Sequence, residues 1–381
     1  MIYCRGHAKD YDEWQTKGAE GWSYADCLPY FKRSENHELG ADAYRGGNGP
    51  LHVVRNTQKD QPLFQAFLDA GVEAGYPFTD DLNGYQQEGF GWHDLTIHNG
   101  QRWSTSAAYL HPVLHRANLT VMTETYVNKV LFSGEKAIGV EIEDSRTKVV
   151  SNISTTNEVV LSGGAINSPQ LLMLSGIGDG DHLKQLQVPI VHHLPAVGNH
   201  MEDHIGVHMQ IACKQPLTLY RASKRYPRNR VRLPTAKSVA SYEHLSSQLR
   251  EDIGHAMTGY IFLLRGSKNG TLRLRSANSR DYPRIDPKYL AQEENRISLR
   301  ESIKLMREIF AQSAFEDLRG KGISPKDAVE LDDEIDAWDL HITWRVLREW
   351  ELTRIRLLTC RLVSTESKDF VLSTRPLCQI L

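Results

Sequence analysis

The chain has 381 residues, of which 40% are hydrophobic, and its formal net charge is −2. This length allows one large core or two moderate cores, and the near-neutral charge gives no electrostatic reason to expect a nucleic acid as partner. The five cysteines are scattered, odd in number and without a C-x-x-C pair, which argues against a disulfide framework or a zinc site and favours a reducing compartment.

The first part of the chain is predicted to contain two helices. Ser23 can cap a helix that includes Tyr24 and Phe31, with Asp26 near its positive end. A second helix is predicted over residues 62–74, because Gly75 and Pro77 end it and four apolar side chains share one face: Phe64, Phe67, Leu68 and Val72. We interpret that face as core.

A turn and an antiparallel meander are predicted next. Asp80 and Asp81 precede Asn83-Gly84, and with no third ligand nearby they indicate a solvated turn and no metal site. Residues 119–123, 126–132 and 137–143 are three strand candidates. Short connections make them antiparallel neighbours, and we expect them to pack on the main sheet.

Residues 158–178 are the most informative stretch. Residues 159–161 suit a short buried strand, and Gly163 and Gly164 allow a sharp turn or a close approach to a ligand. Ser168 and Pro169 then stand where an N-cap and a first helical residue would, and Gly176 can end the helix in a left-handed conformation. The arrangement would point free backbone N–H groups at an anionic or polar ligand, although the spacing alone favours an ordinary strand-to-helix connection.

The second part of the chain is predicted to be mixed α/β. A short helix begins at Asp181 and stops at Pro189, followed by a strand over residues 190–194 and a half-buried strand over residues 271–275. Leu299, Ile303, Met306 and Phe310 define an amphipathic helix, and a last helix is expected near residues 332–338. Residues 215–251 show little pattern, and the character of the chain changes again after residue 339.

Residue identities add a family resemblance. Residues 167–178, Asn-Ser-Pro-Gln-Leu-Leu-Met-Leu-Ser-Gly-Ile-Gly, resemble the second signature of the glucose–methanol–choline (GMC) oxidoreductases, which are FAD-dependent alcohol-oxidising enzymes. Further similar blocks occur in the same order as in that family, at residues 1–14, 100–112, 197–204 and 274–290. Residues 37–40 and 87–92 favour its choline-oxidising branch.

The resemblance implies a two-domain α/β fold with part of an FAD-binding domain at residues 1–205 and part of an antiparallel-sheet substrate domain at residues 206–338. Residues 339–381 are unassigned and resemble nothing in the family. The implied activity is FAD-dependent oxidation of choline to betaine aldehyde in mitochondria. Peripheral membrane association is implied by resemblance only. The mitochondrial location also rests on resemblance, since the first residues carry Asp10, Asp12 and Glu13 and give no targeting signal.

Seven positions are candidates for contact with FAD. By resemblance, the backbone of Val127 would meet the adenine, while Met1 and Ile2 would lie beside the flavin and Asp203 near it. Gly163, Gly164 and Ala165 form the glycine turn. Each also has a plain structural interpretation, as a strand residue or a satisfied polar pair. Four aromatic residues could contact the trimethylammonium group of choline, although core or surface roles are simpler for each: Tyr85, Phe90, Trp92 and Trp103.

Two blocks of the family pattern are not found in the 381 residues. The glycine-rich βαβ unit that holds the FAD pyrophosphate would precede Met1, and a His-Pro…Cys…Met-Gly block with the proton-handling histidine would follow Trp338. Position 200, usually Asn in the family, is His200. No residue is therefore nominated as catalytic, and His204 is a poor substitute. We expect this chain to be impaired or inactive.

Two alternatives remain open. The chain could represent another GMC alcohol dehydrogenase or oxidase, against which the choline-like blocks argue. It could also be a non-catalytic remnant, because loss of a βαβ unit would expose strand edges.

Overall fold

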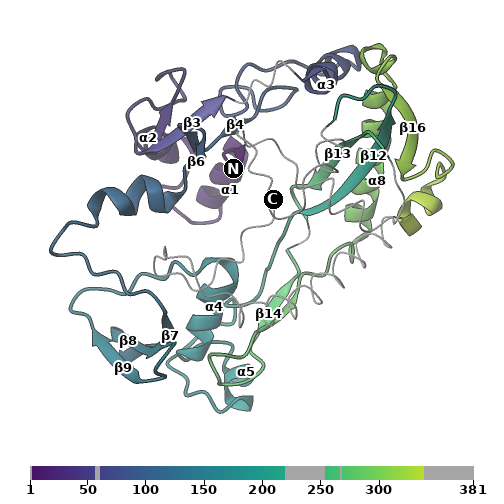
Figure 1. The fold of residues 1–381 in the computed structure, drawn as a ribbon. Coiled ribbons are helices and arrows are strands. Elements are labelled where there is room, and N and C mark those ends of the chain that lie inside the picture. Colours follow the sequence, from purple (N-terminus) through teal and green to yellow (C-terminus); the bar gives the residue numbers. More distant parts are fainter. Residues whose placement is uncertain (1, 56–60, 219–253, 267, 339–381) are drawn as a thin grey trace.

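The structure is a computed structural model that describes residues 2–55, 61–218, 254–266 and 268–338. Its elements gather in three groups, which lie at the upper left, bottom and right of Figure 1. Residues 219–251 of the unpatterned stretch and the tail from residue 339 onward lie outside the described residues. In the described part of the chain, no helix is both long and apolar enough to cross a membrane.

The first group is a four-stranded sheet with two helices. The sheet order is β1-β4-β3-β2, in which β2 runs parallel to β3 and the other pairs are antiparallel. The helix cap predicted at Ser23 is confirmed, since Ser23 and Asp26 form a capping box. The elements are β1 (Ile2–Tyr3), α1 (Ala8–Thr16), α2 (Tyr24–Ser34), β2 (Glu35–His37), β3 (Leu51–Arg55) and β4 (Asp94–Leu95).

The predicted helix at residues 62–74 is confirmed as α3 (Pro62–Glu73), and Gly75 follows it with φ of +90°. Its buried face is shifted from the prediction. Ala66, Leu68, Ala70 and Gly71 are buried, whereas Phe64 and Val72 are 41% and 49% exposed. The small residues let α3 approach its neighbours closely, so the bulkier side chains lie at the margin of the contact. A small hairpin and two short helical turns follow: β5 (Ile97–His98), β6 (Gln101–Arg102), η1 (Ser106–Leu110) and η2 (His111–Val113).

The second group is built around α4 (Gly164–Leu174), which packs on the meander β7 (Thr125–Ser133), β8 (Lys136–Asp144) and β9 (Val150–Ser154). We call these four elements the α4 layer. The pairing of β7 with β8 confirms the predicted strands 126–132 and 137–143. The strand predicted at residues 119–123 is wrong, because that segment lies outside every described sheet. The meander also packs on a helix, and not on a main sheet as predicted.

Two details of the 158–178 stretch differ from the prediction. Residues 159–161 do not form a strand, and Val160 is 73% exposed. The segment belongs to no described sheet, so its backbone groups have no neighbouring strand with which to form hydrogen bonds. The helix begins at Gly164 with Gly163 as N-cap, so Ser168 and Pro169 lie inside it. Ser168 still satisfies the helix start, since its Oγ accepts the N–H of Gly163 at 3.0 Å. The predicted left-handed end is confirmed at Gly176, with φ of +88°.

A small core fixes the C-terminal end of α4. Met173 is buried there with Leu183, Val188, Leu272 and Leu274. The predicted short helix and the strand after residue 271 are confirmed, although the strand expected at 190–194 is reduced to a two-residue pairing with β10. The elements of this region are β10 (Ile177–Gly178), α5 (Gly180–Gln185), β11 (His192–His193), β14 (Thr271–Arg273) and β15 (Arg284–Asp286).

The third group, which we call the α8 layer, places α8 (Glu293–Ala311) against an antiparallel sheet of order β13-β12-β16. The predicted face is confirmed, because Leu299, Ile303, Met306 and Phe310 are all buried. This layer holds the larger core, together with part of α3. Its remaining elements are β12 (Ile205–Cys213), β13 (Ala256–Leu263), η3 (Ser313–Phe315) and β16 (Arg319–Ser324). The described part of the last predicted helix covers residues 332–338.

Candidate functional site

Two of the predicted FAD contacts lie in the α4 layer: the glycine turn at the start of α4, and Val127 in β7. In the order β7-β8-β9, β7 is an edge strand, so among the described strands one of its sides has no partner. Ser175 joins the helix to that strand, because its Oγ accepts the buried N–H of Val130 at 2.8 Å and donates to Leu171 O at 2.6 Å. The structure thus brings the glycine turn and β7 into one layer (Figure 1).

The glycine turn is open toward its surroundings. Gly164 has φ of +81°, and a Cβ placed on it would meet nothing within 4 Å. Gly163 is tighter, because its Cβ would lie 3.0 Å from Asn167 Cβ. Gly164 and Ala165 are exposed. A left-handed glycine with free space beside it, at the start of an eleven-residue helix, can accommodate a ligand close to the backbone.

Val127 lies in β7 where the pairing with β8 shifts register, between Val127 and Lys129. Such a bulge interrupts the ladder and bends the strand. The side chain of Asn128 fills the interruption, since its Oδ1 accepts from Ser279 Oγ at 2.7 Å and its Nδ2 donates to Glu141 Oε1 at 3.2 Å. The backbone at Val127 therefore belongs to an edge strand with an irregular ladder, a suitable place for main-chain contact with a planar ring.

The other candidates for cofactor contact lie elsewhere. Ile2 is 59% exposed in β1, where it pairs with Leu95, and Met1 is outside the described residues. Asp203 is exposed, and its carboxylate accepts from the Tyr289 hydroxyl and, at 2.9 Å, from the N–H of His204. Burial, together with Asp203, raises the pKa of Tyr289 far above its usual value. These contacts describe a satisfied polar group.

The four aromatic candidates for choline are not brought together. Phe90 packs on Phe67 and Tyr76, with ring centroids 5.4 and 5.9 Å apart. Trp103 donates its Nε1–H to Pro50 O at 2.8 Å and contacts the rings of His52 and His98. Tyr85 is 89% exposed and Trp92 is half-buried. No aromatic cage forms from these four side chains.

The strongest electrostatic feature was missed in the sequence. Six side chains of the first sheet and its adjoining loops form a largely buried polar cluster, the Glu35–Asp94 network. Arg5 Nη2 donates to Glu35 Oε2 at 2.7 Å, and Arg55 Nε donates to Asp94 Oδ1 at 2.6 Å. Asn83 links the halves, because its Oδ1 accepts the Arg5 N–H at 2.8 Å and its Nδ2 donates to Asp94 Oδ2 at 3.2 Å. The members are Arg5, Glu35, His37, Arg55, Asn83 and Asp94.

The two carboxylates of the network respond oppositely to their surroundings. Burial raises the pKa of Glu35 despite the N–H of Gly46 and the charge of Arg5. Burial would also raise the pKa of Asp94, but donors from His37 and Arg55 hold it below its usual value. Among the described residues, Glu35 Oε1 has no hydrogen-bond partner. The network fixes β1, which carries Ile2, to the rest of the sheet.

Comparison with known proteins places this geometry in a family. Two models described as GMC oxidoreductase match residues 1–206 and 266–350. The chain is 47% identical over 368 residues to the mitochondrial choline dehydrogenase of Mus musculus, covering 89% of this chain and 61% of the relative. It is 41% identical over 366 residues to an oxygen-dependent choline dehydrogenase of Brucella ovis, covering 88% of this chain and 66% of the relative.

Solved structures agree at the level of fold. Pyridoxine 4-oxidase from Mesorbium loti superposes with a TM-score of 0.76 at 26% identity, covering 89% of this chain and 68% of that one. A formate oxidase superposes with a TM-score of 0.77 at 20% identity, covering 89% and 70%. The mixed α/β fold predicted from the sequence is confirmed. The chain spans less than two thirds of the length of the two choline dehydrogenases. The two family models together cover most of its residues, and the chain belongs to the GMC oxidoreductase family.

Proposed function

We propose that this chain is part of an FAD-dependent oxidoreductase that oxidises a primary alcohol, with choline as substrate and betaine aldehyde as product. The observation that carries the proposal is the 47% identity to a choline dehydrogenase over 89% of the chain. The identity to pyridoxine 4-oxidase is lower, at 26%. The choline assignment therefore stands ahead of another GMC alcohol oxidase.

The α4 layer supports FAD as the cofactor, in part. The unpaired edge of β7 at Val127 suits main-chain contact with adenine, and the open space at Gly164 suits a group at the helix N-terminus. Bound flavin would accept the hydride of the alcohol. The chain's own contribution in this layer is to hold that edge and turn in place, through Ser175 and the small core behind α4.

The phosphate-binding part of the site has no counterpart in the 381 residues, which contain no G-x-G-x-x-G sequence. Because backbone N–H groups of such a loop normally hold the pyrophosphate, we propose that FAD binds this polypeptide too weakly to survive purification. No described residue is assigned as proton acceptor. We therefore propose that the isolated 381-residue chain does not turn over choline.

The test of both statements is direct. The purified chain should be colourless, and it should not oxidise choline in the presence of added FAD and an artificial electron acceptor. A flavin absorption band that remains with the protein after gel filtration would contradict weak binding. The substrate assignment needs a full-length version of the protein, and it would be wrong if that version oxidised pyridoxine or another alcohol faster than choline.

Two further proposals rest on the relatives alone. The mouse and human relatives are named as mitochondrial, whereas those from Brucella are bacterial. We place the protein in mitochondria and, by resemblance, at a membrane surface. Cell fractionation with a tagged chain checks both, since recovery in the cytosolic fraction would contradict the first and release by a low-salt wash would contradict the second.

The non-catalytic alternative has one observation in its favour. Val160 is 73% exposed in a segment that reads as a strand but lies in no described sheet. Such a segment can pair with another chain. A non-catalytic chain could bind a partner or could be a poorly folded remnant. Analytical ultracentrifugation distinguishes these two cases, because a binding role predicts a defined complex and a poorly folded remnant predicts aggregates.

A further inference from the structure

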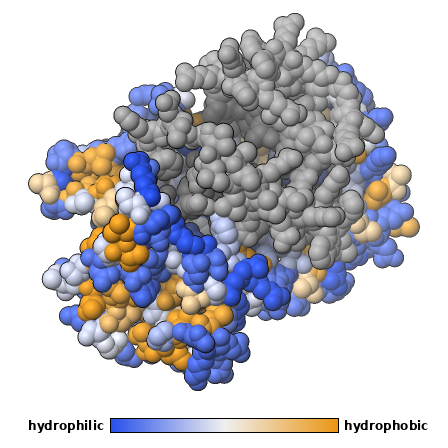
Figure 2. All heavy atoms as spheres, turned by 60° about the horizontal axis from the view of Figure 1, so that its bottom comes forward, coloured by the Kyte–Doolittle hydropathy of each residue, from blue (hydrophilic) through white to orange (hydrophobic). Residues whose placement is uncertain are grey.

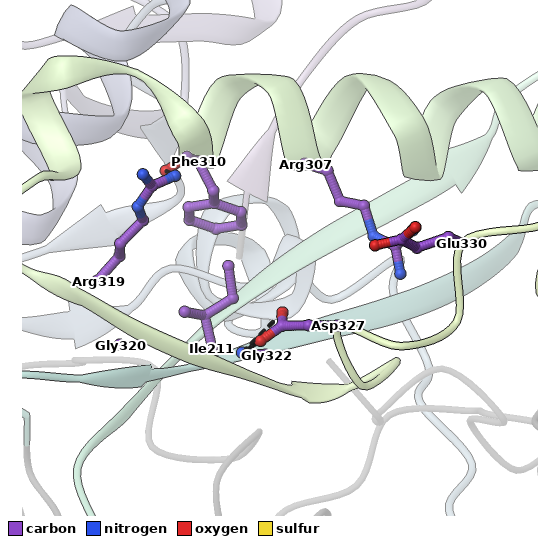
Figure 3. Close-up of a pocket in the computed structure, with 8 residues that line it drawn as sticks. All are labelled: Ile211, Arg307, Phe310, Arg319, Gly320, Gly322, Asp327 and Glu330. Atoms are coloured by element: carbon purple, nitrogen blue, oxygen red, sulfur yellow. Dashed lines mark hydrogen bonds between the residues drawn. The ribbon is translucent and has the colours of Figure 1, made fainter.

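A cavity of about 380 Å³ that opens to solvent beside the exposed residues Asp327 and Glu330 lies in the α8 layer, away from the α4 layer. Figure 3 shows α8 above it and the strands β12 and β16 below. Charged and apolar side chains line it together: Ile211, Arg307, Phe310, Arg319, Asp327 and Glu330. This combination is not that of a simple packing defect, which would be lined by apolar groups alone.

Two glycines of β16 open the floor of this cavity. Gly320 and Gly322 line it without side chains, and a Cβ at Gly322 would overlap the carboxylate of Asp327. That carboxylate is held in place, since its Oδ1 and Oδ2 accept the N–H of Gly322 at 3.0 and 2.9 Å. The negative charge of Asp327 is therefore fixed at the floor.

The two arginines differ in how far they are satisfied. Arg319 Nη1 donates to Phe310 O at 3.0 Å, at the C-terminal end of α8. Arg307 Nη2 is buried and, among the residues that the structure describes, has no hydrogen-bond partner. A buried guanidinium donor without an acceptor is unfavourable, and a ligand oxygen in the cavity would satisfy it.

The charges select one kind of ligand. A bare anion would face the carboxylates of Asp327 and Glu330, and a bare cation would face the guanidinium groups of Arg307 and Arg319. A molecule with one carboxylate and one cationic group avoids both conflicts. Its methylene groups would lie against the buried side chains of Phe310 and Ile211, which are 4% and 9% exposed.

We propose that this cavity, the α8–β16 pocket, binds a small zwitterion of amino-acid size. The carboxylate of the ligand accepts hydrogen bonds from the Arg307 guanidinium, including Nη2. Its cationic end lies against Asp327 and Glu330. The pocket is independent of the FAD and choline proposals, because it shares no residue with the positions assigned to either.

The test uses three matched probes on the purified chain: 4-aminobutanoate, which carries both charges, butanoate, which carries only the negative one, and butylamine, which carries only the positive one. Titration calorimetry or ligand-observed NMR should show 4-aminobutanoate binding about tenfold more tightly than either single-charge probe. Equal binding of the three probes, or no binding of 4-aminobutanoate, would overturn the proposal.

Two variants locate the binding. Arg307→Gln should weaken 4-aminobutanoate about tenfold or more, because the charged donor is lost. Lys304→Gln on the same helix is the matched control, since Lys304 pairs with Glu301 and Asp332 and does not line the pocket. The affinity of Lys304→Gln for 4-aminobutanoate should equal that of the unaltered chain. Circular dichroism establishes that both variants are folded, and Glu330→Gln is the second variant should Arg307→Gln unfold. Equal affinity in the pocket and control variants would overturn the assignment.

Discussion

The α8 layer and the α4 layer differ in how completely each is enclosed. In the α8 layer a nineteen-residue helix covers its sheet, and Ile303 on that helix is fully buried. In the α4 layer every residue of β9 is exposed, and the segment leading into α4 pairs with nothing in the described sheets. Figure 2, which turns this lower part of the molecule forward, shows several apolar patches on its surface.

The difference indicates which of the two layers needs a further partner. A layer with a large core of its own is stable through packing, whereas a layer with a fully exposed strand and exposed apolar residues needs a further partner, such as a cofactor or another segment. The exposed apolar side chains of the α4 layer and its approach segment are Ile138, Val149, Val150, Ile153 and Val160.

The largest predicted effect contrasts two isoleucines. Ile303→Ala should lower the free energy of unfolding by about 2–5 kcal/mol, because it leaves a cavity in the larger core. Ile153→Ala, at a side chain that is 41% exposed in β9, should change it by about 0.5 kcal/mol or less. Urea denaturation measures both. Similar losses for the two variants would remove the contrast between the layers.

The next prediction concerns the bond between α4 and β7. Ser175→Ala should cost about 1–3 kcal/mol, because it leaves the buried N–H of Val130 without an acceptor. Ser168→Ala is the matched control, since its Oγ accepts the less buried N–H of Gly163. We expect a smaller loss there. Thermal melts of the two variants rank them, and the reverse order would show that the α4 layer is held together differently.

A glycine pair tests the two ends of the same layer. Gly176→Ala and Gly134→Ala each place a side chain at positive φ, which costs about 1–2 kcal/mol. Gly176→Ala should be the worse, because its Cβ would also overlap Pro189 O, while Gly134 has nothing within 4 Å. Equal effects would mean that the turn after α4 can relax.

The smallest effect is one of pH, in the Glu35–Asp94 network. The pKa of Asp94 is lowered by folding, so its contribution to stability is present above its usual value of 3.8 and is lost as the pH falls through the lowered value. The pKa of Glu35 is raised, so stability is lost as the pH rises from its usual value of 4.5 through the raised value. These slopes cannot exceed about 1.4 kcal/mol per pH unit for one group.

Two variants separate the two carboxylates. Relative to the unaltered chain, the deficit of Asp94→Asn should shrink as the pH falls below 3.8. The deficit of Glu35→Gln should instead grow as the pH falls from the raised pKa of Glu35 toward its usual value of 4.5. Urea midpoints between acid and neutral pH measure both. Parallel trends in the two variants would contradict the opposite pKa directions.

Local signals in the sequence were enough for some elements. The capping box at Ser23, the glycine stop after α3 and the spacing of Leu299, Ile303 and Met306 each act over a few residues, and the structure confirms them. The family signature at 167–178 was equally readable, because it rests on residue identity.

The predictions that failed concern features that depend on contacts which the local residue pattern does not reveal. Residues 159–161 have strand composition, but a strand also needs a neighbour, and composition does not supply one. The start of α4 was misplaced because Ser168 reaches back to Gly163 from inside the helix. The Glu35–Asp94 network joins residues as far apart as Arg5 and Asp94, so no local pattern reveals it.

The most direct test of the account is hydrogen–deuterium exchange of the 381-residue chain with and without a large excess of FAD. We predict that the protein purifies without flavin and that added FAD slows exchange at residues 125–130 and 163–168, leaving the α8 layer unchanged. Slowing confined to other segments, or none at any FAD concentration, would contradict the assignment of the β7 edge and the α4 turn to the cofactor.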